Sequence, residues 1–179
     1  CAGPQTPPPG PQATEIQLPA DYSADGPGAL VSATRLPTVD RRLLRITSIA
    51  ARISYNSTSG VDGSPQVVTG SVFVPDGTPP EGGWPTIVFG HGTTGVLSEC
   101  GPSLSPTLLG SVDAIRALVT LGYVMVVPDY QGLGNTNSYH PYLDATTAGY
   151  NMVDAASAAK HLVPDMSDRW VAFGVSQGG

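Results

Sequence analysis

Lysine is nearly absent from this sequence, since Lys160 is the only lysine among 179 residues. Eight Lys and Arg residues stand against fourteen Asp and Glu residues, which gives a formal net charge of −6. Binding to a nucleic-acid backbone requires clustered positive charge, and no basic patch can be built from so few residues. Nucleic acid is therefore not an expected partner. A charged share of 12% beside a hydrophobic share of 40% is typical of a folded, core-forming domain.

Long apolar runs are also missing. A membrane-spanning helix needs about 20 consecutive apolar residues, whereas the run from Tyr123 to Val127 is followed at once by Pro128 and Asp129. Any attachment to a membrane must therefore use another route. Cysteine is scarce as well, with only Cys1 and Cys100 in the chain.

Cys1 begins a stretch in which three prolines stand together at positions 7–9. This start resembles that of a mature bacterial lipoprotein, where a cysteine behind a removed signal peptide receives lipid; the alternative is a boundary that falls at a cysteine by accident. We expect residues 1–20 to form a Pro-rich tether, residues 21–179 to form the domain, and the protein to be secreted or held at the cell surface by lipid on Cys1. A lipidated Cys1 has no free thiol, so Cys100 is expected to pair beyond the end of this chain.

Segments typical of strands and of helices alternate along residues 21–179, which predicts a layered α/β domain. Two β-rich runs, Leu43–Tyr55 and Gln66–Val74, flank turn residues 56–64 and predict an antiparallel hairpin. Three further strands are predicted at Thr86–Phe89, Tyr123–Val127 and Arg169–Gly174. The first two of these are apolar throughout, as in strands buried on both faces of a sheet.

Two helices are predicted between these later strands. The first begins after Ser111 as N-cap and ends at Gly122. The second runs from Asp144, as its cap, to about Val163, because Pro164 stops it. Small residues recur at spacings of three and four along the second helix, which predicts that it packs closely against the sheet.

The predicted strand that ends at Gly174 leads directly into Gly174-Val175-Ser176-Gln177-Gly178. This segment matches the nucleophile-elbow pattern, in which a serine on a sharp strand-to-helix turn lifts its hydroxyl above the sheet edge. Gly174 and Gly178 suit that pattern because the strained turn brings these positions too close for a β-carbon. About 0.24 chance matches are expected in a chain this rich in glycine and serine, so a fortuitous turn is the alternative. The preceding strand favours Ser176 as a nucleophile.

A second Gly-rich segment, Gly90–Gly95, follows the predicted strand Thr86–Phe89. Backbone N–H groups that are fixed in advance stabilise the negative charge of a tetrahedral intermediate. Enzymes with a nucleophile elbow take one such N–H from the residue after the nucleophile and another from the loop after the third strand, which indicates Gln177 and Thr93. Gly92 lets the loop pass close to a substrate. The alternative is an ordinary turn at the end of a strand.

None of the three histidines is predicted to be the general base that a nucleophilic serine needs. His91 is expected to support its own loop by hydrogen bonding. His140 and His161 are interpreted as surface or structural residues. Asp129 directly follows a predicted strand and is expected to organise a turn there.

Five motifs occur in order: His91-Gly92-Thr93-Thr94-Gly95; Glu99-Cys100-Gly101-Pro102-Ser103; Gly122-Tyr123 leading to Asp129-Tyr130-Gln131-Gly132-Leu133-Gly134; His140-Pro141-Tyr142; and Ser176-Gln177-Gly178-Gly179. Together they resemble the secretory lipase family, which includes fungal lipases of the A type and many exported bacterial esterases. The resemblance implies an α/β-hydrolase fold, with a mostly parallel central sheet behind the N-terminal antiparallel hairpin. It also implies ester hydrolysis by a Ser-Asp-His triad with Ser176 as nucleophile, and a cap over the site.

In that family the triad aspartate and histidine follow the serine, so we expect a chain truncated after the nucleophile strand. It would be an incomplete gene product, a truncated sequence record or the N-terminal piece of a cleaved enzyme. Alone it is expected to be inactive, because its serine lacks a general base. It is also expected to be poorly stable, because the edge of its sheet lacks a partner strand. The expected partners are a small-molecule or lipid ester and the C-terminal remainder of the enzyme, with no metal or organic cofactor. The alternatives are a serine peptidase of the same fold and a non-catalytic surface lipoprotein.

Overall fold

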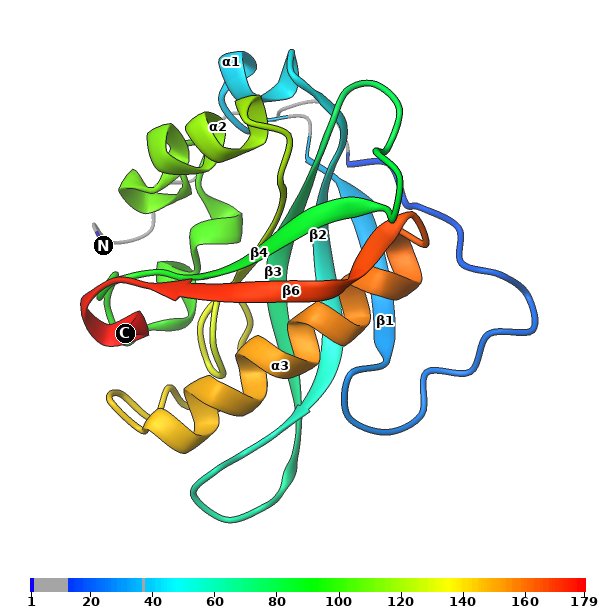
Figure 1. Cartoon of the computed structure of the whole chain (residues 1–179). Coiled ribbons are helices and arrows are strands. Elements are labelled where there is room, and N and C mark those ends of the chain that lie inside the picture. The colour runs from blue at the N-terminus through cyan, green and yellow to red at the C-terminus, as the bar shows by residue number, and fades with distance from the viewer. Residues whose placement is uncertain (2–12, 37) are drawn as a thin grey trace.

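A computed structural model describes Cys1, residues 13–36 and residues 38–179 (Figure 1). Within the described residues, six strands form one sheet in the order β1-β2-β3-β5-β4-β6. The strands are β1 (Leu30–Arg35), β2 (Thr47–Thr58), β3 (Pro65–Pro75), β4 (Trp84–Gly90), β5 (Val124–Pro128) and β6 (Met166–Gly174). The helices are α1 (Arg41–Leu44), α2 (Val112–Thr120) and α3 (Ala145–Leu162), with short 3₁₀ turns at Ser98–Cys100, Pro102–Leu104, Leu108–Gly110 and Ser176–Gly178.

The sheet is mixed. β1, β2, β3 and β5 pair antiparallel, whereas β4 pairs in parallel with both β5 and β6. The predicted hairpin is confirmed as β2 and β3. The strands β5, β4 and β6 form the parallel half of the sheet. The antiparallel half contains, beside the predicted hairpin, one strand, β1, that the sequence pattern did not predict.

The predicted first strand begins too early in the sequence. Residues 41–44 form α1 instead, with the Asp40 side chain accepting a hydrogen bond from its first turn. Leu43 is fully buried in the core beside α2. β2 then continues to Thr58, so the following turn is shorter than predicted. Ser111 precedes α2 as predicted, but its side chain makes no capping hydrogen bond because its own backbone is already helical (φ −86°, ψ −8°).

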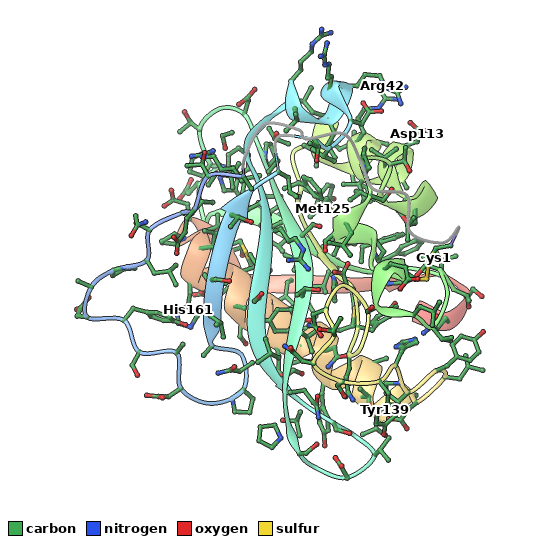
Figure 2. The ribbon with its side chains drawn as sticks, turned by 180° about the vertical axis from the view of Figure 1, so that it is seen from behind. Cys1, Arg42, Asp113, Met125, Tyr139 and His161 are labelled. Atoms are coloured by element: carbon green, nitrogen blue, oxygen red, sulfur yellow. A yellow bond between two sulfur atoms is a disulfide. The ribbon has the colours of Figure 1, made fainter. Side chains whose placement is uncertain are left out.

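Helices cover both faces of the central strands. Along β5, Val124 and Val126 pack in the cluster beneath α3, while the alternate residues Met125 and Val127 pack in the cluster with α1 and α2. Figure 1 shows α3 crossing one face of the sheet, and Figure 2 shows the same ribbon from behind, with Met125 labelled near its centre. The predicted close packing of α3 is confirmed by four buried alanines, Ala155, Ala156, Ala158 and Ala159.

The segment before β1 is tied to the sheet. Ile16 N donates a hydrogen bond to the Ala33 carbonyl at 2.8 Å, and Arg35 N donates one to the Thr14 carbonyl at 2.8 Å. Ile16 and Leu18 pack against the core beneath α3. This end of the expected tether therefore contacts the core, because alternate apolar side chains of an extended segment point to one side. Residues 2–12, which make up most of the expected tether, lie outside the described residues.

Cys1 and Cys100 form a disulfide across 99 residues, which lies beside the Cys1 label in Figure 2. The expectation that Cys100 pairs beyond the chain end is therefore wrong, because Cys1 reaches the loop in which Cys100 is buried. A lipid would occupy the same sulfur of Cys1, so the disulfide and the lipid anchor are alternatives at one atom. Lipid attachment stays a prediction. No helix in the described part of the chain is long and apolar enough to cross a membrane.

Candidate active site

The two Gly-rich motifs leave the sheet at the same edge. Gly90 and Gly174, the last residues of β4 and β6, lie opposite each other in these parallel strands. Just beyond them, Val175 N donates a hydrogen bond to the Gly90 carbonyl at 3.1 Å. A β-carbon built on Gly92 would lie 3.7 Å from the β-carbon of Ser176. The fold therefore brings together two loops that are more than 80 residues apart in sequence.

Ser176 has a strained backbone and an exposed side chain. Its φ is +53°, a left-handed value that costs a non-glycine residue about 1–3 kcal/mol. The turn is so tight that a β-carbon on Gly174 would lie 1.7 Å from the Gly178 carbonyl oxygen. A β-carbon on Gly178 would lie 2.2 Å from the Gly90 carbonyl oxygen. The turn thus excludes side chains on both sides of the serine, while the serine itself faces solvent.

His91 holds the loop after β4 from its buried side. Its imidazole is almost completely buried, with Nε2 3.0 Å from the Asp129 carbonyl oxygen and Nδ1 2.6 Å from the Gly92 carbonyl oxygen. Backbone groups therefore occupy both ring nitrogens. Thr93 lies two residues further along, is exposed, and has its hydroxyl 3.0 Å from that of Tyr142.

Asp129 follows β5 and is fully buried. Its carboxylate accepts hydrogen bonds from Ser103 N at 2.9 Å, Ser103 Oγ at 2.5 Å and Thr69 Oγ1 at 2.7 Å. Arg52 donates to Ser103 Oγ at 3.0 Å and to the Gly134 carbonyl at 2.5 Å. Asp129 therefore has a structural role, as expected, but its carboxylate joins the loop after β4 to β3 and does not bond within the turn that follows β5.

Tyr130 is a site neighbour that the sequence reasoning missed. Its hydroxyl donates a hydrogen bond to the His91 carbonyl at 2.8 Å, and its ring stacks on the His91 ring at a centroid distance of 4.4 Å. Burial raises the pKa of this hydroxyl well above its usual value, so Tyr130 stays a neutral donor at physiological pH. The same hydroxyl would lie 2.6 Å from a β-carbon on Gly178. Tyr130 thus contacts one motif and closely approaches the other.

His140 is a second neighbour of the site, whereas the sequence pattern indicates only a surface or structural histidine. Its Nε2 lies 2.9 Å from the side-chain nitrogen of Gln177, the residue after Ser176. Burial lowers the pKa of His140. A signal for both missed residues was present, since the residues after β5 must lie at the edge where parallel strands end. His161 belongs elsewhere: its ring packs against the Tyr22 ring in a tilted arrangement, with a centroid distance of 5.1 Å, and it lies far from Cys1 in Figure 2.

A cavity of about 430 Å³ lies between α3 and the turn at Ser176. Its lining is mostly apolar and includes Met152, Trp170, Tyr130, His140, Ser176 and Gln177. In the part of the chain that the structure describes, no group of three or more His, Cys, Asp or Glu residues could hold a metal ion.

No protein-family model and no curated protein sequence matches this chain. Solved structures do match. The rice cell wall degrading esterase LipA from Xanthomonas oryzae superposes with a TM-score of 0.67 at 25% identity, over 86% of this chain and 43% of that chain. Candida antarctica lipase A superposes with a TM-score of 0.68 at 18% identity, over 92% of this chain and 38% of that chain.

These similarities show that the chain has the α/β-hydrolase fold. The chain spans less than half the length of either neighbour. Of these two neighbours, one is an esterase and the other is a lipase.

Proposed function

We propose that this chain is the nucleophile-bearing part of a serine carboxylic-ester hydrolase, an esterase or lipase. The observation that carries the proposal is the exposed Ser176 on a left-handed turn, at the sheet edge shared with the Gly90–Gly95 loop. The likeness to an esterase and a lipase of the same fold supports it. A secreted or cell-surface location, with lipid on Cys1 as an alternative to the disulfide, belongs to the same proposal.

In the proposed reaction, Ser176 Oγ attacks the ester carbonyl carbon and gives its proton to a general base. The backbone N–H groups of Thr93 and Gln177 donate hydrogen bonds to the resulting oxyanion. Collapse of the intermediate expels the alcohol, which takes up the proton, and leaves an acyl group on Ser176. Water then attacks this acyl group by the same steps, which releases the acid and restores the Ser176 hydroxyl. His91 and Tyr130 contribute before the reaction begins, because their hydrogen bonds fix the loop that carries Thr93.

The general base is proposed to be a histidine outside this sequence, supported by an aspartate that also lies outside it. His91 has both ring nitrogens against backbone carbonyls. His140 directs its Nε2 to Gln177. His161 packs against the Tyr22 ring near the other end of α3. The C-terminal remainder of the enzyme is therefore the proposed partner of this chain.

The test is covalent labelling with a fluorophosphonate probe, which reacts with activated serines. The full-length protein should be labelled at Ser176, as located by peptide mass spectrometry. A Ser176→Ala variant should lose the label, while the control Ser157→Ala, at an exposed serine of α3, should keep it. Assays with an aryl ester and a peptide amide then separate an esterase from a peptidase. Absence of labelling would support a non-catalytic surface protein instead.

A further inference from the structure

One short segment contacts both residues that the proposed function assigns to the oxyanion. This segment, His140-Pro141-Tyr142, lies between β5 and α3. His140 Nε2 is 2.9 Å from Gln177 Nε2, and the Tyr142 hydroxyl is 3.0 Å from Thr93 Oγ1. Gln177 and Thr93 come from separate loops, so the segment bridges the two halves of the proposed oxyanion hole.

The contacts of His140 define which ring nitrogen carries the proton. Nδ1 lies 2.8 Å from the Gln131 carbonyl oxygen, which can only accept, so Nδ1 is the donor. In a neutral ring Nε2 then carries the lone pair, and the Gln177 amide donates to it. The Gln177 amide oxygen is buried and has no partner in the described part of the chain. A neutral His140 with this tautomer therefore accounts for the observed orientation of Gln177.

The bridging segment is itself firmly held. Gln131 Nε2 donates to Ser138 Oγ at 3.0 Å, and Gln131 N donates to Asn151 Oδ1 of α3 at 2.8 Å. Gly132 has a φ of +79°, and a β-carbon there would lie 2.2 Å from the Tyr139 carbonyl carbon. The backbone just before His140 is thus held by the turn after β5, and α3 holds that turn through Asn151.

We propose that His140 and Tyr142 are positioning residues for the oxyanion hole, with His140 orienting Gln177 and Tyr142 orienting Thr93. Each acts through a side-chain hydrogen bond on a residue whose backbone N–H would meet the oxyanion. The proposal rests on the proposed function. It adds two residues, outside the nucleophile and the base, that influence the rate of the chemical step through Gln177 and Thr93.

The role of His140 has a pH signature. Protonation of Nε2 would place two donors face to face, and the Gln177 amide would have to turn its oxygen toward His140. The groups that face His140 are His91, the rings of Tyr130 and Tyr142, and Asp144 across the shared cavity. Burial lowers the pKa of His140 by more than the hydrogen bond to the Gln131 carbonyl raises it, and the neighbouring His91 lowers it further, so this disruption is expected only below the ordinary histidine range.

The test uses steady-state ester hydrolysis by the full-length protein. Asn at position 140 can still donate to Gln131 but does not reach Gln177. His140→Asn and Tyr142→Phe should each lower kcat about tenfold, less than the roughly 100-fold or greater loss of an oxyanion donor, with KM within about twofold because the oxyanion forms only in the transition state. Thermal stability should stay close to that of the unsubstituted protein. The matched control Tyr139→Phe, at an exposed neighbour, should leave kcat unchanged.

A double substitution separates positioning from general damage. If His140 acts through the Gln177 side chain, His140→Asn combined with Gln177→Met should be no slower than the slower single variant. The kcat ratio of unsubstituted protein to His140→Asn should also fall as the pH is lowered through the pKa of His140. Unchanged kcat in both single variants, with Ser176 still labelled by fluorophosphonate, would overturn this inference and leave the proposed function standing. Loss of labelling in the unsubstituted protein would overturn both.

Discussion

At the residue scale, the position with least freedom is Gly174. A methyl group there would meet the Gly178 carbonyl oxygen at 1.7 Å, and that atom is backbone rather than a movable side chain. The turn that carries Ser176 would have to open before the two atoms could separate. The glycine is thus needed for the shape of the turn rather than for any contact with a substrate.

Gly174→Ala is therefore expected to abolish fluorophosphonate labelling of Ser176 and to lower the free energy of unfolding by about 1–3 kcal/mol or more. Gly149→Ala is the matched control, because a β-carbon at this α3 position meets nothing within 4 Å. That change should keep the label and raise the free energy of unfolding by about 0.5–1 kcal/mol, since alanine favours a helix over glycine. Labelling that survives Gly174→Ala would show that Ser176 does not depend on this turn.

At the element scale, a polar contact joins β2 to α3. Ser57 Oγ donates to Asp154 Oδ2 at 2.7 Å and accepts from Asn151 Nδ2 at 2.9 Å. Burial raises the pKa of the Asp154 carboxyl, and the Ser57 hydrogen bond lowers it by less. The folded protein therefore holds this proton more tightly than the unfolded chain. The contribution of Asp154 to stability is fully present below the unfolded pKa near 3.8 and is lost as the pH rises through the folded pKa.

Asp154→Asn removes the charge and keeps an oxygen that can accept from Ser57. Its free energy of unfolding at pH 7 should equal or exceed that of the unsubstituted protein, and this advantage should vanish as the pH falls below 3.8. Urea denaturation at several pH values measures both effects. Ser57→Ala should lower the free energy of unfolding at pH 7, because it removes the hydrogen bond that favours the carboxylate. If Asp154→Asn instead has a lower free energy of unfolding than the unsubstituted protein at pH 7, the carboxylate stabilises this contact.

The elements that the sequence predicted are those whose signals are local. The paired runs of β2 and β3, the apolar strands β4 and β5, and the Asp144 cap of α3 each carry their own pattern, and the cap is confirmed by a hydrogen bond from Thr147 N. β1 was missed because its pairing with β2 is a tertiary contact. α1 was missed because four residues are too few to show a helical period.

At the scale of the whole molecule, the candidate site depends on the order of the strands. The sequence identified both Gly-rich motifs, because their glycines and their serine are visible within a few residues. It missed Tyr130, His140 and Tyr142, whose contacts cross from the loop after β5 to those after β4 and β6. Only the parallel arrangement of these three strands, with β4 between the other two, brings those loops to one edge.

The outer edge of β6 is a second consequence of this strand order. β6 pairs with β4 alone in the described sheet, and none of its residues belongs to the buried cluster that packs with α1 and α2. Val171, Phe173 and Val175 are 59%, 55% and 46% exposed there. An unpaired strand edge with adjacent apolar side chains invites association with other chains. In the described sheet, this is the edge that the sequence analysis expects to lack a partner strand.

Residues 1–179 produced alone are therefore expected to bind a hydrophobic dye and to self-associate. Val171→Lys places a charge on this face and should lower dye fluorescence and the associated fraction in size-exclusion chromatography by at least about twofold. Val61→Lys is the matched control, because Val61 is 57% exposed in the β2–β3 turn, away from β6. It should change neither quantity. Each substitution adds one positive charge to a chain of formal charge −6. Equal effects of the two substitutions would therefore attribute the association to net charge and would rule out the β6 edge as its cause.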